Sequence, residues 1–160
     1  MSGESVSEVV KKVIVVHVPV AFAFEVFTER MGQWWPETHH IGDTKFADIL
    51  MDKRAGGRLY ERNVNGKECP WGTILQWEPP RRVGFTWQLQ PDWKFSEDLT
   101  KASEVEISFH EETAARTRVE LVHRHLQRHG EGWEKLRIAV DSPGGWTAIL
   151  ERFAELANRG

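Results

Sequence analysis

The stretch "PGGWTAILERFAELA", residues 143–157, decides the fold, because its apolar side chains recur three and four residues apart. This spacing is typical of a helix with one apolar face. Pro143 suits the first helical position, and Asp141 or Ser142 can cap the N-terminus of the helix. No other segment predicts a helix as long, so the rest of the chain has to cover this face. The apolar face consists of Trp146, Ile149, Leu150, Phe153, Leu156 and Ala157.

The middle of the chain predicts strands. The runs "RLYERN" (58–63) and "WGTILQWE" (71–78) flank the dipeptide Asn65-Gly66. Asn-Gly between two alternating runs is the strongest short-range sign of a β-hairpin. Alternation of this kind indicates an antiparallel sheet with one face covered. Three further segments alternate in the same way, at 82–90, 103–112 and 117–126.

The N-terminal part adds the remaining elements. Residues 9–18 are rich in β-branched side chains and predict a buried strand, and 20–28 predict a short helix. A second short helical turn ends at Pro36, and 47–54 predict another strand. The order is therefore one strand, two short helices, six strands and a long helix. This order predicts an α+β fold in which about seven antiparallel strands cover the C-terminal helix.

The composition is that of an ordinary globular protein. The chain has 160 residues, 40% of them hydrophobic and 28% charged, with a formal net charge of −3. We expect a single domain over 1–160, a flexible tail at 1–8, and a possible lid at 127–142 between glycine-containing turns. No basic block suggests a nucleic acid partner. The eight tryptophans and eight phenylalanines predict bulky apolar walls, in a packed core or around a cavity.

Other classes of protein find no support in the sequence. Cys69 is the only cysteine, which excludes an internal disulfide and a zinc site with several thiolates. The N-terminus has no signal-peptide pattern, and no apolar run approaches the ~20 residues of a membrane helix. We therefore expect a cytoplasmic protein without a membrane span.

Four stretches resemble one known superfamily. In chain order they are "AFEVFTERMGQWWP", "RAGGRLYER" continued by "NGKECPWGTILQWEPPRRVGFTW", "TRVELVHRHL" and "GGWTAILERFAELA". Together they span roughly residues 9–158, and they resemble the SRPBCC superfamily, also called START-like or birch-pollen-allergen-like. Within it, the sequence is most similar to the branch named for the activator of heat-shock-protein-90 ATPase.

The resemblance implies a helix-grip fold, in which a curved sheet grips the long helix around a largely apolar cavity. Members bind lipids, sterols, polyketides or other hydrophobic molecules, and a minority catalyse cyclisation, dehydration or hydrolysis. On this basis one of the two tryptophans at 34–35, Trp35, is expected at the cavity mouth, and Tyr60 is expected to contact the ligand. The expected wall comprises Trp71, Leu75, Trp77, Phe85, Trp87, Phe109, Val119 and Leu121, closed by Trp146, Leu150 and Phe153.

The histidines are the candidate polar groups. Strand geometry places His123 and His125 on one face, about 7 Å apart, together with the apolar side chains of that strand. There they could bind a ligand carbonyl or act as acid or base. They could equally be solvated or paired with backbone groups. His39 and His40 are neighbours whose side chains diverge, so we expect them at the cavity rim and expect neither a metal nor a cofactor.

Three hypotheses follow. The first is a non-enzymatic protein, monomeric or dimeric, that binds a small hydrophobic molecule. The second is an enzyme of the same fold with His123 or His125 as acid or base. The third, a co-chaperone, carries over the activity for which the branch is named. A cavity larger than about 300 Å³ would favour the first two hypotheses over the third.

Overall fold

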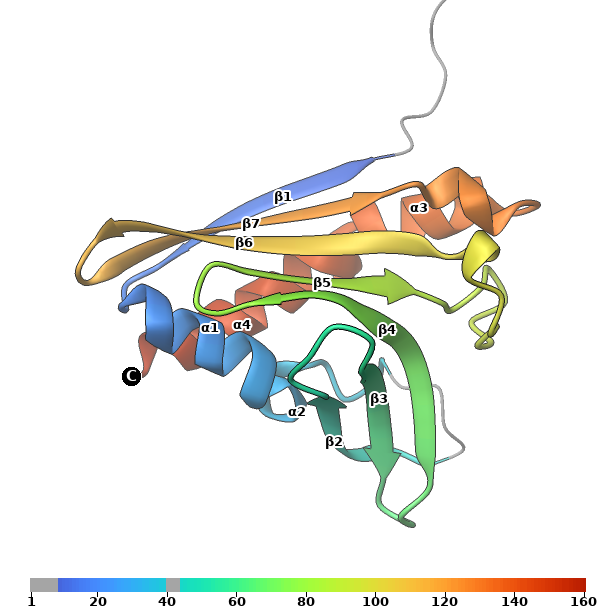
Figure 1. Ribbon diagram of the computed structural model, residues 1–160, viewed down its shortest axis with the longest axis horizontal. Helices are drawn as coiled ribbons and strands as arrows, with labels where there is room; N and C mark the ends of the chain where they lie inside the picture. Colours follow the sequence, from blue (N-terminus) through green and yellow to red (C-terminus); the bar gives the residue numbers. More distant parts are fainter. Residues whose placement is uncertain (1–8, 40–43) are drawn as a thin grey trace, which may run out of the picture.

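The computed structural model describes residues 9–39 and 44–160, so the expected tail at 1–8 and His40 lie outside the described residues. Seven strands form one antiparallel sheet in the order β1-β7-β6-β5-β4-β3-β2. The sheet curls, and Figure 1 shows β2 and β3 turned away from β6 and β7. The strands are β1 (Val10–Val16), β2 (Phe46–Met51), β3 (Arg58–Asn63), β4 (Glu68–Glu78), β5 (Arg82–Trp87), β6 (Ser103–Thr113) and β7 (Arg116–Arg124).

The two short helices and the C-terminal helix lie close to the positions that the sequence predicts, and α3 (Trp133–Asp141) is an additional helix. Two short helices follow β1, and the last helix lies on the inner side of the curled sheet (Figure 1). The predicted α+β helix-grip architecture is therefore confirmed. The helical elements are α1 (Val20–Glu29), α2 (Met31–Trp34), η1 (Leu99–Lys101), η2 (Leu126–His129), α3 (Trp133–Asp141), η3 (Pro143–Thr147) and α4 (Ala148–Asn158).

The predicted hairpin forms between β3 and β4. Gly66 has a φ of +88°, a left-handed conformation that glycine adopts at no steric cost. The backbone N–H of Asn63 donates to the carbonyl of Lys67, which closes the loop at 2.8 Å. The hairpin sets the register of β4, the strand that carries Trp71 towards the inner side of the sheet.

Two β-bulges in β4 change which of its side chains face inward. Ile74 pairs with Phe85, but the next pair is Gln76 with Gly84, so Leu75 is the extra residue. The alternation shifts by one there, because a bulge inserts one unpaired residue. Ile74 is buried and Leu75 is 41% exposed. The prediction that Leu75 lines the cavity is therefore wrong. A second register shift, beside Tyr60, makes Trp71 the other extra residue.

Aromatic side chains fill one half of the space between the sheet and α4. Phe24 and Phe27 of α1 enter this space, and their rings lie 5.2 Å and 5.8 Å from the ring of Phe109 on β6. Phe27 also lies 5.2 Å from Phe153 of α4. A cavity cannot extend between these edge-to-face rings, so any ligand site is confined to the other half of the grip.

The C-terminal helix is interrupted where the sequence predicts a continuous start at Pro143. Residues 143–147 form a wide π-type turn, and Gly145 has non-helical dihedrals (φ −89°, ψ −131°). A Cβ at Gly145 would overlap the carbonyl oxygens of Val140 and Ala139, so only glycine fits. The regular helix begins at Ala148, and the turn directs Trp146 into the interior, where it is 1% exposed.

Candidate ligand-binding pocket

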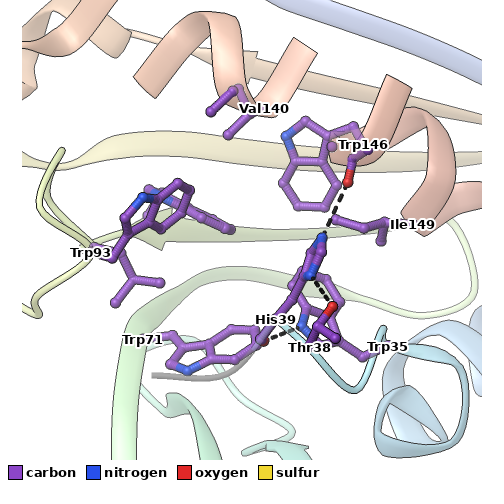
Figure 2. Close-up of a pocket in the computed structure, with 13 residues that line it drawn as sticks. Trp35, Thr38, His39, Trp71, Trp93, Val140, Trp146 and Ile149 are labelled. Carbon is purple, nitrogen blue, oxygen red and sulfur yellow. Dashed lines mark hydrogen bonds between the residues drawn. The ribbon is translucent and has the colours of Figure 1, made fainter. Parts of the chain in front are cut away.

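A pocket of about 370 Å³ lies in the half of the grip that the α1 phenylalanines leave open. Figure 2 shows side chains from the α2–β2 connection, from the strands and from the C-terminal turn pointing towards one another around it. Its volume falls in the range of small-molecule sites. The wall consists of Trp35, Thr38, His39, Trp71, Trp87, Leu89, Trp93, Ala139, Val140, Gly144, Gly145, Trp146 and Ile149.

Five of these residues are tryptophans, and three of their indole N–H groups have protein partners. Trp35 Nε1 donates to the backbone carbonyl of His39 at 2.8 Å. Trp71 Nε1 donates to the fully buried carboxylate of Glu61 at 2.9 Å. Trp146 Nε1 donates to His123 Nδ1 at 3.1 Å. These bonds hold three flat rings in fixed orientations around the pocket.

Trp87 differs from these three. Its side chain is only 5% exposed, yet its Nε1 has no hydrogen-bond partner. Trp93, the fifth indole, is 46% exposed and contacts Trp87 edge to face at 6.4 Å. Trp87 Nε1 is therefore a buried side-chain donor in the pocket wall that has no acceptor.

His39 joins two sides of the pocket mouth. Its Nε2 lies 3.1 Å from the carbonyl oxygen of Gly144, and its Nδ1 lies 3.0 Å from Thr38 Oγ1 (Figure 2). A carbonyl can only accept, so Nε2 carries the proton and Nδ1 accepts from the hydroxyl. His39 lies at the rim, as the sequence predicts, and it is the one titratable side chain in the wall described above.

A chain of polar side chains lies behind the Trp146 side of the wall. His123 Nε2 lies 2.7 Å from Ser103 Oγ, and that oxygen lies 2.7 Å from His129 Nε2. His129 Nδ1 then lies 3.2 Å from Gln90 Oε1. Adjacent strands bring these groups together, because β6 pairs with β7 and Trp87 pairs with Ser103.

The direction of each bond in this polar chain follows from its first member. The indole N–H of Trp146 can only donate, so His123 Nδ1 accepts and His123 Nε2–H donates to Ser103. The Ser103 hydroxyl then donates to His129, whose Nδ1–H donates to the amide oxygen of Gln90. Burial, and next the neighbouring His129, lower the pKa of His123 to about 3. Burial lowers the pKa of His129 to about 4. Both imidazoles are therefore neutral at pH 7.

The two histidines singled out from the sequence do not share one strand face. His123 is fully buried and lies behind the wall, where Ser103 and Trp146 occupy both of its ring nitrogens. His125 lies outside β7, which ends at Arg124. Its φ of +63° turns the chain out of the strand to begin η2. The prediction that period-2 alternation carries through His125 is therefore wrong.

Four of the fifteen predicted contact residues lie in the pocket wall: Trp35, Trp71, Trp87 and Trp146. Tyr60 instead packs beneath the guanidinium of Arg58, whose Cζ lies 4.0 Å from the centre of the Tyr60 ring. Trp77 packs against Phe24 of α1, 5.3 Å away. The remaining predicted apolar wall residues belong to the buried core, where Phe109 and Phe153 contact the aromatic side chains of α1. These core residues are Phe85, Phe109, Val119, Leu121, Leu150 and Phe153.

Several wall residues escaped the sequence argument. Trp93 lies in an irregular connection without periodicity, and Val140 and Ala139 come from α3, inside the segment 127–142 that the sequence marks as a possible lid. Ile149 was recognised as part of the apolar helix face but was not assigned to the cavity. The usable signals were the indole of Trp93 and the apolar spacing of α3.

Residues 9–39 and 44–160 offer neither a cluster of metal ligands nor a membrane-spanning helix. Within these ranges, no group of three or more His, Cys, Asp or Glu side chains could hold a metal ion. None of the helices they form is both long and apolar enough to cross a bilayer.

Comparison with known proteins agrees with the architecture. The family model for activator of Hsp90 ATPase homolog 1-like proteins matches residues 17–158. An anthrahydroquino-γ-pyrone synthase, Txn09, solved in complex with SUM, is 40% identical, with 92% of this chain and 96% of that chain covered and a TM-score of 0.66. No curated protein sequence matches.

More distant structures share the fold. The self-sacrificing resistance protein CalC from Micromonospora echinospora is 24% identical over 96% of both chains, with a TM-score of 0.68. Protein NE0264 from Nitrosomonas europaea is 19% identical over 94% of both chains, with a TM-score of 0.66. By its sequence and its helix-grip architecture, the chain belongs to the family of activator of Hsp90 ATPase homolog 1-like proteins, within the SRPBCC superfamily.

Proposed function

We propose that this protein binds a planar, polycyclic aromatic molecule of the polyketide type in the tryptophan-lined pocket. Membership of the family supports a ligand-binding or cyclase-type role. The observation that carries the finer proposal is the set of five indoles around about 370 Å³. Flat rings offer stacking and edge-to-face contacts that a flexible acyl chain cannot use equally.

The energetics favour a flat apolar ligand. Burial of apolar surface contributes roughly 25 cal/mol per Å², before the costs of association. The hydrogen bonds of Trp35, Trp71 and Trp146 hold their rings in place without a ligand. Because these side chains are already ordered, binding loses little side-chain entropy. The wall contains no carboxylate or ammonium group that would have to be desolvated.

Tryptophan fluorescence tests this proposal. Anthracene-2-sulfonate and anthraquinone-2-sulfonate serve as flat probes, and dodecanoate serves as a flexible probe. We expect saturable quenching by at least one of the flat probes at concentrations where dodecanoate has no effect. Stronger binding of dodecanoate than of both flat probes would contradict the proposal. Native mass spectrometry of protein purified under mild conditions would identify a retained molecule directly.

A second candidate function is ring closure on such a ligand. The 40% identity to an anthrahydroquino-γ-pyrone synthase favours it. His39 is the wall's titratable side chain, and its Nδ1 carries the lone pair that accepts from Thr38. A ligand hydroxyl in place of that of Thr38 could pass its proton to Nδ1 while its oxygen bonds to a carbonyl carbon and the C=O π electrons move to the carbonyl oxygen. That oxygen takes the proton back from Nδ1, and the resulting hydroxyl leaves as water with a proton from the neighbouring carbon, which forms the ring double bond. His123 has neither a free nitrogen nor access to the pocket.

The ring-closure candidate is tested with 2-hydroxydibenzoylmethane, which closes to flavone with loss of one water. We expect the wild-type protein to accelerate flavone formation above the buffer rate. His39→Ala should keep the affinity for the probe and lose the acceleration, while His110→Ala, an exposed site on β6, should behave as wild type. Binding without acceleration would remove this candidate and leave the binding proposal intact.

The co-chaperone hypothesis rests on the name of the family, and it gives the pocket no role. This hypothesis predicts that the protein stimulates the ATPase of a purified chaperone in the absence of any small molecule. Stimulation that survives blockage of the pocket would favour it over the two functions above.

A further inference from the structure

The indole N–H of Trp87 is the one unsatisfied donor among the buried tryptophans of the pocket wall. Trp35, Trp71 and Trp146 each donate to a protein acceptor at 2.8–3.1 Å. Trp87 is also buried, with 5% of its surface exposed, and its nitrogen has no partner. Buried donors in native proteins are nearly always paired, so an exception calls for an explanation.

An unpaired buried donor is unfavourable, and the chemistry of indole restricts what could relieve it. The Nε1–H group donates and cannot accept, so its missing partner must be an acceptor. No carboxylate lines this pocket, so no negative charge of the wall opposes the approach of an electron-rich oxygen. A hydrogen bond formed only in the complex would recover most of what the unpaired group costs. The site thus favours ligands with an oxygen acceptor.

The position of Trp93 suggests how an acceptor reaches the nitrogen. The ring of Trp87 lies 5.6 Å from the ring of Trp146, and the hydrogen bond from Trp146 to His123 holds the Trp146 ring in place. On another side Trp87 contacts Trp93, which is 46% exposed. Trp93 also has a φ of +64°, a conformation unusual for a bulky side chain. Of these two neighbours, Trp93 is the more exposed and lacks the hydrogen bond that holds the ring of Trp146, so its displacement costs less than that of Trp146.

We propose that Trp87 Nε1–H is the hydrogen-bond anchor of the pocket and selects aromatic ligands with a ring carbonyl or phenolic oxygen at their edge. This inference rests on the proposed binding function and refines it. It assigns the ligand class to quinones, pyrones and related oxygenated aromatics, in preference to aromatic hydrocarbons of the same shape. Trp93 moves aside as the oxygen enters between the two rings.

A matched pair of probes and a matched variant test the anchor. Anthraquinone-2-sulfonate and anthracene-2-sulfonate share three fused rings and the sulfonate, and they differ in the two ring carbonyls. Trp87→Phe keeps an aromatic ring and removes the N–H. We expect Trp87→Phe to weaken binding of the quinone roughly five- to tenfold more than binding of the anthracene, because both probes lose the same ring contact and only the quinone loses a hydrogen bond. Trp93→Phe, which keeps the Trp87 donor, should preserve the preference for the quinone.

A second measurement does not depend on the variant. In the wild-type protein labelled with ¹⁵N, the assigned indole N–H signal of Trp87 should move downfield with the quinone and not with the anthracene. An unmoved signal, or equal losses of affinity for both probes in Trp87→Phe, would overturn the anchor. If neither probe binds the wild-type protein, the proposed binding function is wrong. If both probes bind and Trp87→Phe weakens both equally, the binding function stands and only the anchor is wrong.

Discussion

Trp146 donates its indole N–H to Nδ1 of His123, 3.1 Å away, and this bond fixes the direction of every hydrogen bond in the polar chain behind the pocket. The donor-only indole forces His123 to donate to Ser103, and Ser103 in turn donates to His129. One side of the ligand pocket is thus held by two imidazoles that have to stay neutral. Stability should depend on their protonation.

Acid should destabilise the protein well above the pH at which carboxyl groups titrate. The pKa values of His123 and His129 fall to about 3 and about 4 in the folded state, whereas an unfolded histidine has a pKa near 6.5. Between these values the unfolded chain binds more protons, so the unfolding free energy falls as the pH drops. We expect a slope approaching about 1.4 kcal/mol per pH unit for each histidine between pH 6 and 5.

Urea denaturation at half-unit pH intervals measures this slope. His129→Gln should reduce it by about half, because one of the two buried proton sites is gone. His17→Gln should leave it unchanged, since His17 is exposed on the chain that follows β1. A stability that is flat from pH 6.5 to 5 would contradict the neutral polar chain.

Removal of the middle member of the polar chain should be costly. Ser103→Ala leaves His123 Nε2–H without an acceptor and His129 Nε2 without the hydroxyl donor. We expect a loss of about 1–3 kcal/mol in unfolding free energy, the range for an unsatisfied buried group. Ser108→Ala is the control on the same strand, because Ser108 is only partly buried. Equal melting temperatures for Ser103→Ala and Ser108→Ala would contradict the hydrogen-bonded chain through Ser103.

The turn before α4 should tolerate a side chain at one glycine and not at its neighbour. A Cβ at Gly145 would overlap the carbonyl oxygens of Val140 and Ala139, whereas a Cβ at Gly144 has no atom within 4 Å. Gly145→Ala should lower the unfolding free energy by about 1–3 kcal/mol, as overpacking does, and Gly144→Ala should stay close to wild type. Calorimetric melting of the two variants decides, and equal melting temperatures would contradict the described turn.

The bulge in β4 makes two adjacent apolar residues behave differently. Ile74 is 1% exposed and Leu75 is 41% exposed. Ile74→Ala should cost about 2–5 kcal/mol, and Leu75→Lys should change the unfolding free energy by less than about 0.5 kcal/mol. If Leu75→Lys unfolds the protein, Leu75 faces the interior and the register shift is wrong.

The fold could be predicted from the sequence because its signals are local. The Asn65-Gly66 turn, the alternation along β5 to β7 and the helical spacing of α4 each involve near neighbours in the chain. The bulge at Leu75 was not predicted, because Ile74 and Leu75 are adjacent and both apolar, and the sequence does not say which of the two faces inward.

The pocket was less predictable than the fold, because it depends on contacts between distant segments. The sequence predicts a cavity closed by Trp146, Leu150 and Phe153, and nothing in it indicates that Phe24 and Phe27 fill the half beside Phe153. The joining of His123 to His129 through Ser103 required the register of β6 against β7. Trp93 lies in an irregular segment, where position cannot be read from periodicity.

Calorimetric titration with anthraquinone-2-sulfonate tests the central claim, that the space between the indoles holds a flat aromatic molecule. Gly144→Trp places an indole at the pocket mouth, where a Cβ would meet no atom within 4 Å, and Leu75→Trp adds the same side chain outside the pocket. We predict binding of one molecule per chain to the wild type and to Leu75→Trp, and at least a tenfold weaker affinity for Gly144→Trp. Equal affinities in all three proteins, or no binding to the wild type, would contradict the account.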